Sequence, residues 1–438
     1  MTHMRSQKRM LWPLFFIFAL LLTACSSTST ATKPSAITDT RSKTDMITAA
    51  DACTATIGMP GSCVSPVTLR KAYGIEPLIA KGDTGKGQTV VDIVSFGSPT
   101  LQQDMDVFDR TFALPPVNLQ VIAPLTMPEQ DPHHDKQGWG SETTLDVQII
   151  HALAPDAKIV VLESPVAETE GTIGLPQFRQ LEQYVIDHKL GNIVTHSWGA
   201  SELTLTDSAG RAELAQWDTL LKTGTLTDKI TYLSSSGDNG ATDYSDLNGT
   251  QLGKVPTTSF VASSPWTTSV GGSQLNVVNG QAQETAWNGS GGGFSRFYTT
   301  PDYQKTLPSE TLQQFQNRRG VPDVAALADP STGFPVYDNG SWALIGGTSA
   351  SAPQWAAIVA IANQMAGHPL GFINPALYQI ASSNAYHQDF NDITNGNNTN
   401  VTADVKGYPA AIGWDPITGL GTPDAQNLIP ALIAQDKN

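Results

Sequence analysis

Short apolar runs alternate with amphipathic segments along most of the chain. The run Thr89–Phe96 (TVVDIVSF) is rich in β-branched residues and predicts a buried strand. Leu101–Phe112 follows with apolar residues at helical spacing, which predicts an amphipathic helix. Further strands are predicted over 158–162, 192–195 and 230–234, and further helices over 142–153, 177–188, within 203–222 and over 349–365.

This alternation predicts the fold class. Strands that alternate with helices favour an α/β domain with a mostly parallel central sheet and helices on both faces. In such sheets, reactive side chains gather at the carboxyl ends of the strands. The chain has 438 residues and shows neither an internal repeat nor a long linker after Ser65. We therefore expect one large domain over residues 65–438.

The N-terminal segment has a different pattern. Basic residues at 5–9 precede an apolar stretch over 11–22, which is too short for a membrane span and typical of a signal peptide. The sequence LTAC that ends at Cys25 resembles the bacterial lipobox, in which the cysteine carries a diacylglyceryl anchor. We predict a signal peptide over 1–24 and a lipid anchor on Cys25 that tethers the chain to the outer face of the cell membrane. The alternative is an ordinary signal peptide followed by secretion.

The residues after the predicted anchor indicate a spacer. Residues 26–50 contain 12 Ser or Thr and almost no large apolar residues, so residues 25–64 are interpreted as a flexible tether and a short loop. Of the three cysteines, Cys53 and Cys63 remain as a pair in an exported protein. We predict a disulfide that closes a loop of about ten residues; two free thiols are the alternative.

The charge balance limits the partners. The chain has 25 Lys and Arg against 40 Asp and Glu, which gives a formal net charge of −15. This argues against nucleic acid as a partner, because phosphates require a basic surface; we expect none. The acidic balance suits a protein that works in acid, where carboxylates become protonated, but it equally suits any soluble protein.

The most specific chemical signal is the segment Gly346–Pro353 (GGTSASAP). The glycines allow a sharp turn. A serine at the start of a helix lies where backbone N–H groups and the helix dipole stabilise developing negative charge, as a nucleophile in acyl transfer requires. A simple serine N-cap is the alternative for Ser349. However, GTSASAP resembles the nucleophile motif of the subtilisin-like clan, which implies a subtilisin-like three-layer α/β/α fold.

A serine nucleophile needs a base, and subtilisin-like enzymes use a histidine. His133 and His134 lie in a polar loop without the surrounding histidine motif. His151 and His196 are isolated, and we interpret both as structural. The segment Asp83–Gly85 precedes the first strand instead of following it, so it does not match the aspartate of such a triad.

Carboxylates offer a different base. Glu142 and Asp146 are four residues apart, so they share one face of a helix and can share a proton at mildly acidic pH. A carboxylate with a raised pKa can then accept the serine proton. Asp238 lies in a glycine-flanked turn after a predicted strand and, while neutral, can donate to an oxyanion. Surface carboxylates and a turn-forming aspartate are the alternatives.

Together, these three segments resemble the sedolisin family of serine-carboxyl peptidases. The resemblance covers roughly residues 65–427. Other segments that carry it are 65–75, 97–115, 154–157, 197–199, 263–272 and 319–324. It implies that Ser349 is the nucleophile, Glu142 the base, Asp146 its partner and Asp238 the oxyanion acid. It also implies an acid-acting endopeptidase that acts on peptides or proteins, which we expect to be a monomer.

The resemblance extends to a calcium site near the C-terminus. The implied ligands of one structural Ca²⁺ are the carboxylates of Asp392 and Asp415 and the carbonyls of Ile393, Ala411 and Gly413. The family often has glycine where Ala411 stands, so this carbonyl binds only if alanine tolerates the backbone angles. A polar Asn/Asp-rich turn is the alternative.

The chain departs from the family in one respect. Family members commonly carry a long N-terminal prodomain, whereas about forty residues separate Cys25 from the mature-like start at Ser65. We expect folding either without a prodomain or with a separate chain. Three functional alternatives stay open: a neutral peptidase that uses histidine, a tripeptidyl exopeptidase, and a tethered non-catalytic binding protein on the same fold.

Overall fold

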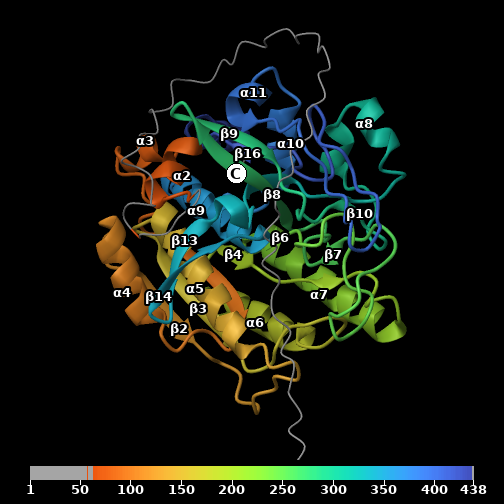
Figure 1. The fold of residues 1–438 in the computed structure, drawn as a ribbon, viewed down its shortest axis with the longest axis horizontal. Helices are drawn as coiled ribbons and strands as arrows, with labels where there is room; N and C mark the ends of the chain where they lie inside the picture. Colours follow the sequence, from red (N-terminus) through yellow and green to blue (C-terminus); the bar gives the residue numbers. More distant parts are fainter. Residues whose placement is uncertain (1–56, 58–62, 437–438) are drawn as a thin grey trace, which may run out of the picture. The chain divides into compact units, whose positions relative to one another are not determined.

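The central sheet has eight strands in the part of the chain that the computed structural model describes, which is residue 57 and residues 63–436. The strand order is β12-β8-β6-β4-β1-β3-β2, with β9 paired to β8 (Figure 1). All neighbours along this order are parallel, and only the β8–β9 pair is antiparallel. The strands are β1 (Thr89–Ser95), β2 (Asn118–Ile122), β3 (Lys158–Ser164), β4 (Ile193–His196), β6 (Thr231–Ser235), β8 (Thr268–Val278), β9 (Gln281–Ala286) and β12 (Val324–Leu327).

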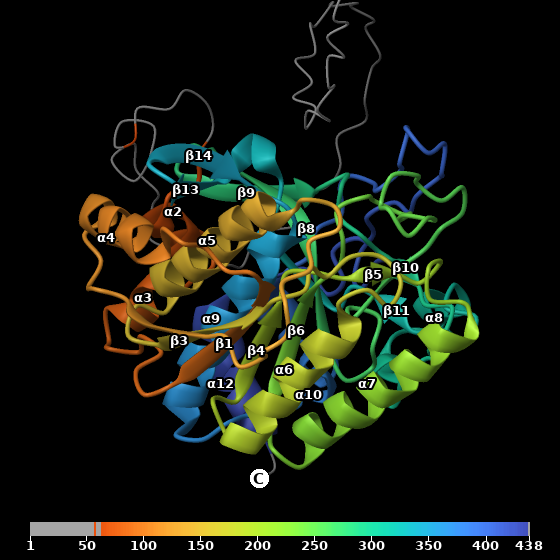
Figure 2. The same ribbon diagram turned by 90° about the horizontal axis from the view of Figure 1, so that it is seen from below.

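Helices cover both faces of this sheet (Figure 2). The longer helices are α4 (Leu101–Phe112), α5 (Lys136–Leu153), α6 (Leu175–His188), α7 (Ser208–Leu226), α9 (Thr348–Ala366), α10 (Asn374–Ala381) and α12 (Ala425–Gln435). Shorter elements are α2 (Pro66–Ala72), α3 (Glu76–Ile79), α8 (Ser309–Gln313), α11 (Tyr386–Asp389), β5 (Ala200–Ser201), β7 (Ser259–Phe260), β10 (Gly293–Phe294), β11 (Gly320–Val321), β13 (Phe334–Asp338), β14 (Ser341–Ile345), β15 (Phe390–Asn391) and β16 (Thr422–Pro423).

The residues of β1 explain why the sheet has two covered faces. Val90 and Val94 belong to the core formed with α5 and α9, whereas Val91 and Ile93 belong to the core formed with α6 and α7. Successive side chains of a strand point to opposite faces, so a strand buried on both sides reads as a continuous apolar run. The predicted α/β fold with a mostly parallel sheet and helices on both faces is confirmed.

Most of the predicted elements occur with small changes in their bounds. The helix predicted over 101–112 is α4 with the same bounds, and the strand predicted over 89–96 is β1. The helix predicted over 142–153 begins six residues earlier, at Lys136, because the glycines at 138 and 140 did not favour a helix in the sequence. The hairpin β8–β9 and the strand β2 were not predicted.

The predicted N-terminal features lie almost entirely outside the described residues. This applies to the signal peptide over 1–24, to Cys25 and to most of the tether over 25–64. Cys63 takes part in a disulfide bond. Its predicted partner Cys53 lies outside the described residues, so the pairing stays a prediction. Within the residues described, no helix combines the length and the apolar character needed to cross a membrane.

The carboxyl ends of β4 and β6 lie side by side, because these two strands pair in parallel. The segment Ser197–Gly199 follows β4, and the turn that contains Asp238 follows β6. The first turn of α9 meets this edge, where the Thr348 hydroxyl accepts a hydrogen bond from the Gly237 amide over 3.0 Å. Segments that are more than a hundred residues apart in sequence therefore converge at one edge of the sheet.

Candidate active site

Ser349 is the second residue of α9 and is partly exposed. The helix begins after Gly347, whose φ of 104° lies in the region that favours glycine. A Cβ atom at Gly347 would lie only 2.6 Å from Oδ2 of Asp238. The glycine predicted from the motif is therefore required both by its backbone angle and by the close approach of Asp238.

Glu142 and Asp146 project from α5, which packs against α9. The Ser349 hydroxyl lies near enough to the Glu142 carboxyl to lower its pKa, and it donates to the Ser197 carbonyl oxygen over 3.5 Å. The Ser197 hydroxyl lies 2.9 Å from Oδ1 of Asp146 and 3.2 Å from the Ser349 carbonyl oxygen. The structure thus brings Ser349, Glu142 and Asp146 together, with Ser197 in contact with both ends of the group.

The protein environment makes the two carboxyls of α5 hard to ionise. Glu142 is partly exposed as a residue, but its Oε1 atom is buried and has no hydrogen-bond partner among the described residues. Burial raises the pKa of Glu142 to about 8; the nearby Ser349 hydroxyl opposes this rise, and the charges of Asp238 and Asp92 add to it. Burial, followed by the charges of Asp92 and Glu142, raises the pKa of Asp146 well above its ordinary value.

Asp92 is a third carboxyl of this group that the sequence reasoning missed. It lies on β1, its side chain is 0 % exposed, and it interacts directly with the Asp146 carboxyl. No donor group elsewhere in the described residues bonds to its two oxygens. Burial raises the pKa of Asp92 to about 7. Two adjacent carboxyls of this kind share a proton, so Asp92 extends the chain of carboxyls from Glu142 through Asp146 into the core.

One signal in the sequence could have identified Asp92. It is the one charged residue in the apolar run TVVDIVSF, and a buried strand rarely contains an aspartate without a partner.

Asp238 follows β6 and is bonded to Thr348, the first residue of α9. Its Oδ1 atom accepts hydrogen bonds from the Thr348 amide over 2.7 Å and from the Thr348 hydroxyl over 2.8 Å. Although the residue keeps an exposed surface, the protein packed around the carboxyl raises its pKa, and the two Thr348 bonds act in the opposite direction. Both protein donors use Oδ1, which leaves Oδ2 to carry a proton.

The histidines have partners elsewhere. His151 is buried, with Nε2 2.8 Å from the Pro115 carbonyl oxygen and 3.2 Å from Oδ1 of Asp109. His196 is buried against Glu182. The nearest acidic partner of His133 is Asp135, over 3.9 Å. These contacts agree with structural roles for His151 and His196 and do not support a histidine base.

The predicted calcium ligands lie together in the C-terminal loops. The Gly413 amide donates to Oδ2 of Asp392 over 3.0 Å, and the Ala411 amide donates to Oδ2 of Asp415 over 3.1 Å. Ala411 does not have a positive φ, so alanine is tolerated there. Oδ1 of Asp392 is buried without a hydrogen-bond partner among the described residues, and burial raises the pKa of Asp415 to about 7. Both observations fit a site that binds a cation.

The described residues contain no cluster of three or more His, Cys, Asp or Glu side chains suited to a metal ion. A site built from Asp392, Asp415 and backbone carbonyls has only two such side chains, so it would need the carbonyl ligands of Ile393, Ala411 and Gly413. The calcium site remains a prediction that these residues fit.

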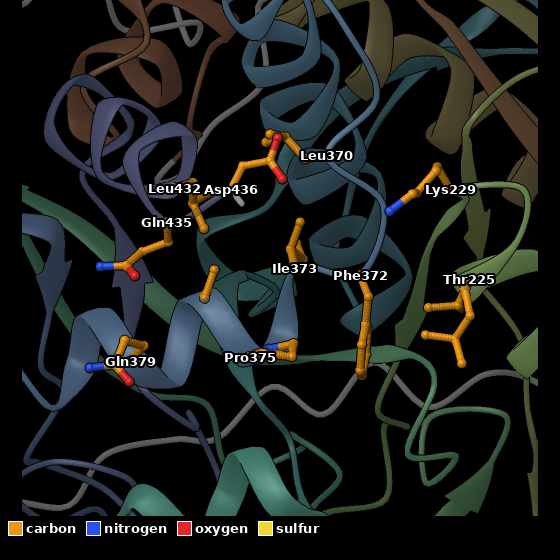
Figure 3. Close-up of a pocket in the computed structure, with 12 residues that line it drawn as sticks. Thr225, Lys229, Leu370, Phe372, Ile373, Pro375, Gln379, Leu432, Gln435 and Asp436 are labelled. Carbon is orange, nitrogen blue, oxygen red and sulfur yellow. The ribbon is translucent and has the colours of Figure 1, made fainter. Parts of the chain in front are cut away.

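A pocket of about 660 Å³ lies away from these residues, between the end of α7, the loop after α9, and helices α10 and α12 (Figure 3). Its lining includes Lys229, Phe372 and Gln435, and none of the four predicted catalytic residues. The candidate active site is therefore identified by its hydrogen bonds and buried carboxyls and not by this cavity.

Comparisons with known proteins bear on this arrangement. No family model matches the chain. Kumamolisin of Bacillus sp. (strain MN-32) is 34 % identical over 382 residues, covering 84 % of this chain and 63 % of kumamolisin. Tripeptidyl-peptidase 1 of Homo sapiens is 29 % identical over 393 residues, covering 84 % of this chain and 64 % of the relative. The chain thus spans less than two thirds of the length of these curated relatives.

A solved structure is matched over its whole length. The structure of Pseudomonas sedolisin, a serine-carboxyl proteinase complexed with two molecules of pseudo-iodotyrostatin, superposes with a TM-score of 0.72 at 26 % identity. The match covers 86 % of this chain and 100 % of that chain.

Proposed function

The chain belongs to the sedolisin family of serine-carboxyl peptidases, and on this basis we propose that it is an acid-acting endopeptidase that cleaves peptide bonds through an acyl-enzyme on Ser349. One observation carries the proposal: the Ser349 hydroxyl and the raised-pKa carboxyl of Glu142 lie near each other, while Thr348 holds Asp238 beside the same helix turn. The substrates are peptides or proteins.

The acylation step uses both carboxyls. The Ser349 Oγ atom attacks the substrate carbonyl carbon, and the hydroxyl proton passes to Glu142. The carbonyl oxygen becomes an oxyanion, which accepts a hydrogen bond from protonated Asp238. Glu142 then gives the proton to the leaving amine as the C–N bond breaks. Water attacks the acyl-enzyme by the reverse path, with Glu142 again accepting and returning the proton.

The protonation states explain the expected pH range. Glu142, Asp146 and Asp92 influence one another's pKa and titrate as a group, and Glu142 acts as a base when it carries negative charge of this group. Asp238 has to stay protonated to donate. As the pH rises through the raised pKa of Asp238, the donor is lost and activity falls. As the pH falls, the group of three becomes fully protonated and the base is lost.

Two further parts of the proposal concern location and stability. The LTAC sequence supports a lipid anchor on Cys25 that tethers the peptidase to the outer face of the bacterial cell membrane. The carboxylates of Asp392 and Asp415, with the carbonyls of Ile393, Ala411 and Gly413, would hold one Ca²⁺. The ion would neutralise the two carboxylates and fix the C-terminal loops.

Tripeptidyl exopeptidase action is a second candidate, because several relatives are named as tripeptidyl-peptidases. An exopeptidase of this kind requires a free substrate amino terminus, whereas an endopeptidase does not. Acetylation of the amino terminus of a peptide substrate therefore separates the two. Cleavage of the acetylated peptide supports the endopeptidase, and its complete resistance supports the tripeptidyl-peptidase.

The central test is peptide hydrolysis by the full chain from pH 3 to pH 8, beside Ser349→Ala and Glu142→Gln. Ser351→Ala is the matched control, because its hydroxyl lies within hydrogen-bond distance of the carbonyls of Ala326 and Leu327 instead of the site. We expect an acid optimum that both site variants lose and the control keeps. A folded chain, shown by a cooperative melting transition, that cleaves no peptide at any pH would favour the non-catalytic binding protein.

A further inference from the structure

Pro353, the last residue of the GGTSASAP segment, deprives one backbone carbonyl of α9 of its usual donor. In a regular α-helix, the carbonyl oxygen of residue 349 accepts a hydrogen bond from the amide N–H of residue 353. Residue 353 is a proline inside α9, so it has no N–H, and a proline ring also crowds the carbonyl four residues before it. The carbonyl of Ser349 therefore depends on a donor from outside this turn of the helix.

Ser197 provides such a donor. It is the first residue after β4, it is only 7 % exposed, and its hydroxyl donates to the Ser349 carbonyl oxygen over 3.2 Å. Because α9 packs against β4, this hydrogen bond joins the first turn of the helix to the end of a central strand. The Ser197 hydroxyl thus holds the backbone of Ser349 at the edge of the sheet where the candidate active site lies.

The same two residues also meet in the opposite direction. The Ser349 hydroxyl donates to the Ser197 carbonyl oxygen over 3.5 Å, which is a long hydrogen bond. One residue therefore contacts both the backbone carbonyl and the reactive hydroxyl of Ser349. This pair of contacts limits both the tilt of the helix turn and the position of the Ser349 Oγ atom.

Asp146 of α5 is the third group at this point. The Ser197 hydroxyl lies 2.9 Å from Oδ1 of Asp146. A hydroxyl has one hydrogen to donate, but its oxygen can also accept one. When the Asp146 carboxyl is protonated and donates to Ser197, the hydroxyl hydrogen is free for the Ser349 carbonyl. Burial and the charges of Asp92 and Glu142 raise the pKa of Asp146, which favours this protonated form.

We propose that Ser197 is a positioning residue of the active site, whose hydroxyl replaces the helix donor that Pro353 lacks and so fixes Ser349 for attack on the substrate. This inference rests on the proposed function, because Ser197 acts through the same nucleophile. It also gives the proline of the motif a role. An N–H at residue 353 would bond the Ser349 carbonyl within α9, and the carbonyl would then not depend on Ser197.

The first test measures this hydrogen bond without chemistry. The free energy of unfolding in urea is measured for the full chain and for Ser197→Ala, Pro353→Ala and the double variant. Pro353→Ala restores an N–H to the helix, so the Ser349 carbonyl regains a donor. Ser197→Ala should then cost about half or less of what it costs in the parent chain. Equal costs in the two backgrounds would overturn the proposal.

Ser290→Ala is the matched control for the unfolding test. Ser290 is also buried, and its hydroxyl donates to the Ile417 carbonyl oxygen over 2.8 Å, away from α9. The cost of Ser290→Ala should be the same with and without Pro353→Ala. If its cost fell as much as that of Ser197→Ala, Pro353→Ala would be acting on the whole fold, and the assignment of the coupling to Ser197 would be wrong.

The second test measures kcat and KM for one peptide at the optimal pH. We expect Ser197→Ala to lower kcat about tenfold and to leave KM nearly unchanged, because the nucleophile is misplaced while the substrate contacts stay. In the Pro353→Ala background, the loss should be about threefold or less. An unchanged kcat, a loss confined to KM, or an equal loss in both backgrounds refutes the positioning role and keeps the peptidase. Coupling in the unfolding test without cleavage of any peptide refutes the peptidase and keeps the hydrogen bond.

Discussion

Replacing Asp92 by asparagine tests whether the buried carboxyls of β1 and α5 act as one titrating group. Asp92→Asn keeps the size of the side chain and removes its charge. The charge of Asp92 raises the pKa of both Glu142 and Asp146. Without it, both carboxyls ionise at lower pH, so the acidic limb of the activity profile should move down by about one pH unit. The fall in activity at higher pH, which we assign to Asp238, should stay at the same pH, because Asp92 is not among the causes of the raised pKa of Asp238.

The stability of the same variant gives an independent magnitude. Burial raises the pKa of Asp92 from 3.8 to about 7, so the folded chain holds a proton that the unfolded chain releases across this pH range. Stability is therefore lost as the pH rises from 3.8 to about 7. A shift of this size corresponds to roughly 4 kcal/mol, as an upper value because Asp146 shares the proton. Asp92→Asn has no carboxyl to ionise at this position, so it does not lose this stability. The difference in the free energy of unfolding between the variant and the parent should therefore change in favour of the variant as the pH rises.

Two assays check these expectations. The activity profile is measured from pH 3 to pH 8 with a saturating and a dilute peptide, and urea unfolding is measured at pH 4 and at pH 7. Asp106→Asn, an exposed aspartate of α4, is the matched control and should change neither result. An Asp92→Asn chain whose acidic limb and whose pH dependence of unfolding both match the control would refute the coupling of Asp92 to the active site.

The remaining predictions concern the oxyanion acid, the turn before Ser349 and the calcium loops. Asp238→Asn keeps a donor that does not ionise, so the fall in activity at high pH should shift upward by one pH unit or more in a kcat/KM profile; an unchanged limb would exclude Asp238 as its cause. Gly347→Ala introduces a Cβ that would meet Oδ2 of Asp238 at 2.6 Å and strains the backbone at a φ of 104°, so activity should fall about 100-fold and the melting temperature should also fall; full activity would contradict the assigned geometry. Calcium should raise the melting temperature of the parent chain, and Asp415→Asn should lose most of this rise; equal responses would exclude the proposed ligands.

The fold could be predicted to the extent that periodicity is strong. Leu101–Phe112 has a clear apolar face, and the structure has this helix with the same bounds. The hairpin β8–β9 was missed even though Asn279 and Gly280 form its turn with positive φ values of 52° and 78°. An Asn-Gly pair after the β-branched residues Val277 and Val278 is a strong hairpin signal, and the sequence reasoning did not use it.

The site could be predicted only in part. The spacing of Glu142 and Asp146 placed them on one helix face, which the structure bears out in α5. No spacing rule connects either residue to Ser349, because the contact depends on how α5 packs against α9. The resemblance to a family supplied that connection. Asp92 was missed because the run that contains it was assigned to a buried strand, and its aspartate was not considered separately.

The bonds of Thr348 to Asp238 have a consequence for the folding of the chain. The amide and the hydroxyl of Thr348 both hold Asp238, the proposed oxyanion acid, and the next residue is Ser349, the proposed nucleophile. The two reactive groups are therefore completed by a single docking event between the end of β6 and the first turn of α9. On the proposed mechanism, a partly folded chain in which these segments have not met has neither group in place, so we expect it not to cut itself or its neighbours before its core is assembled.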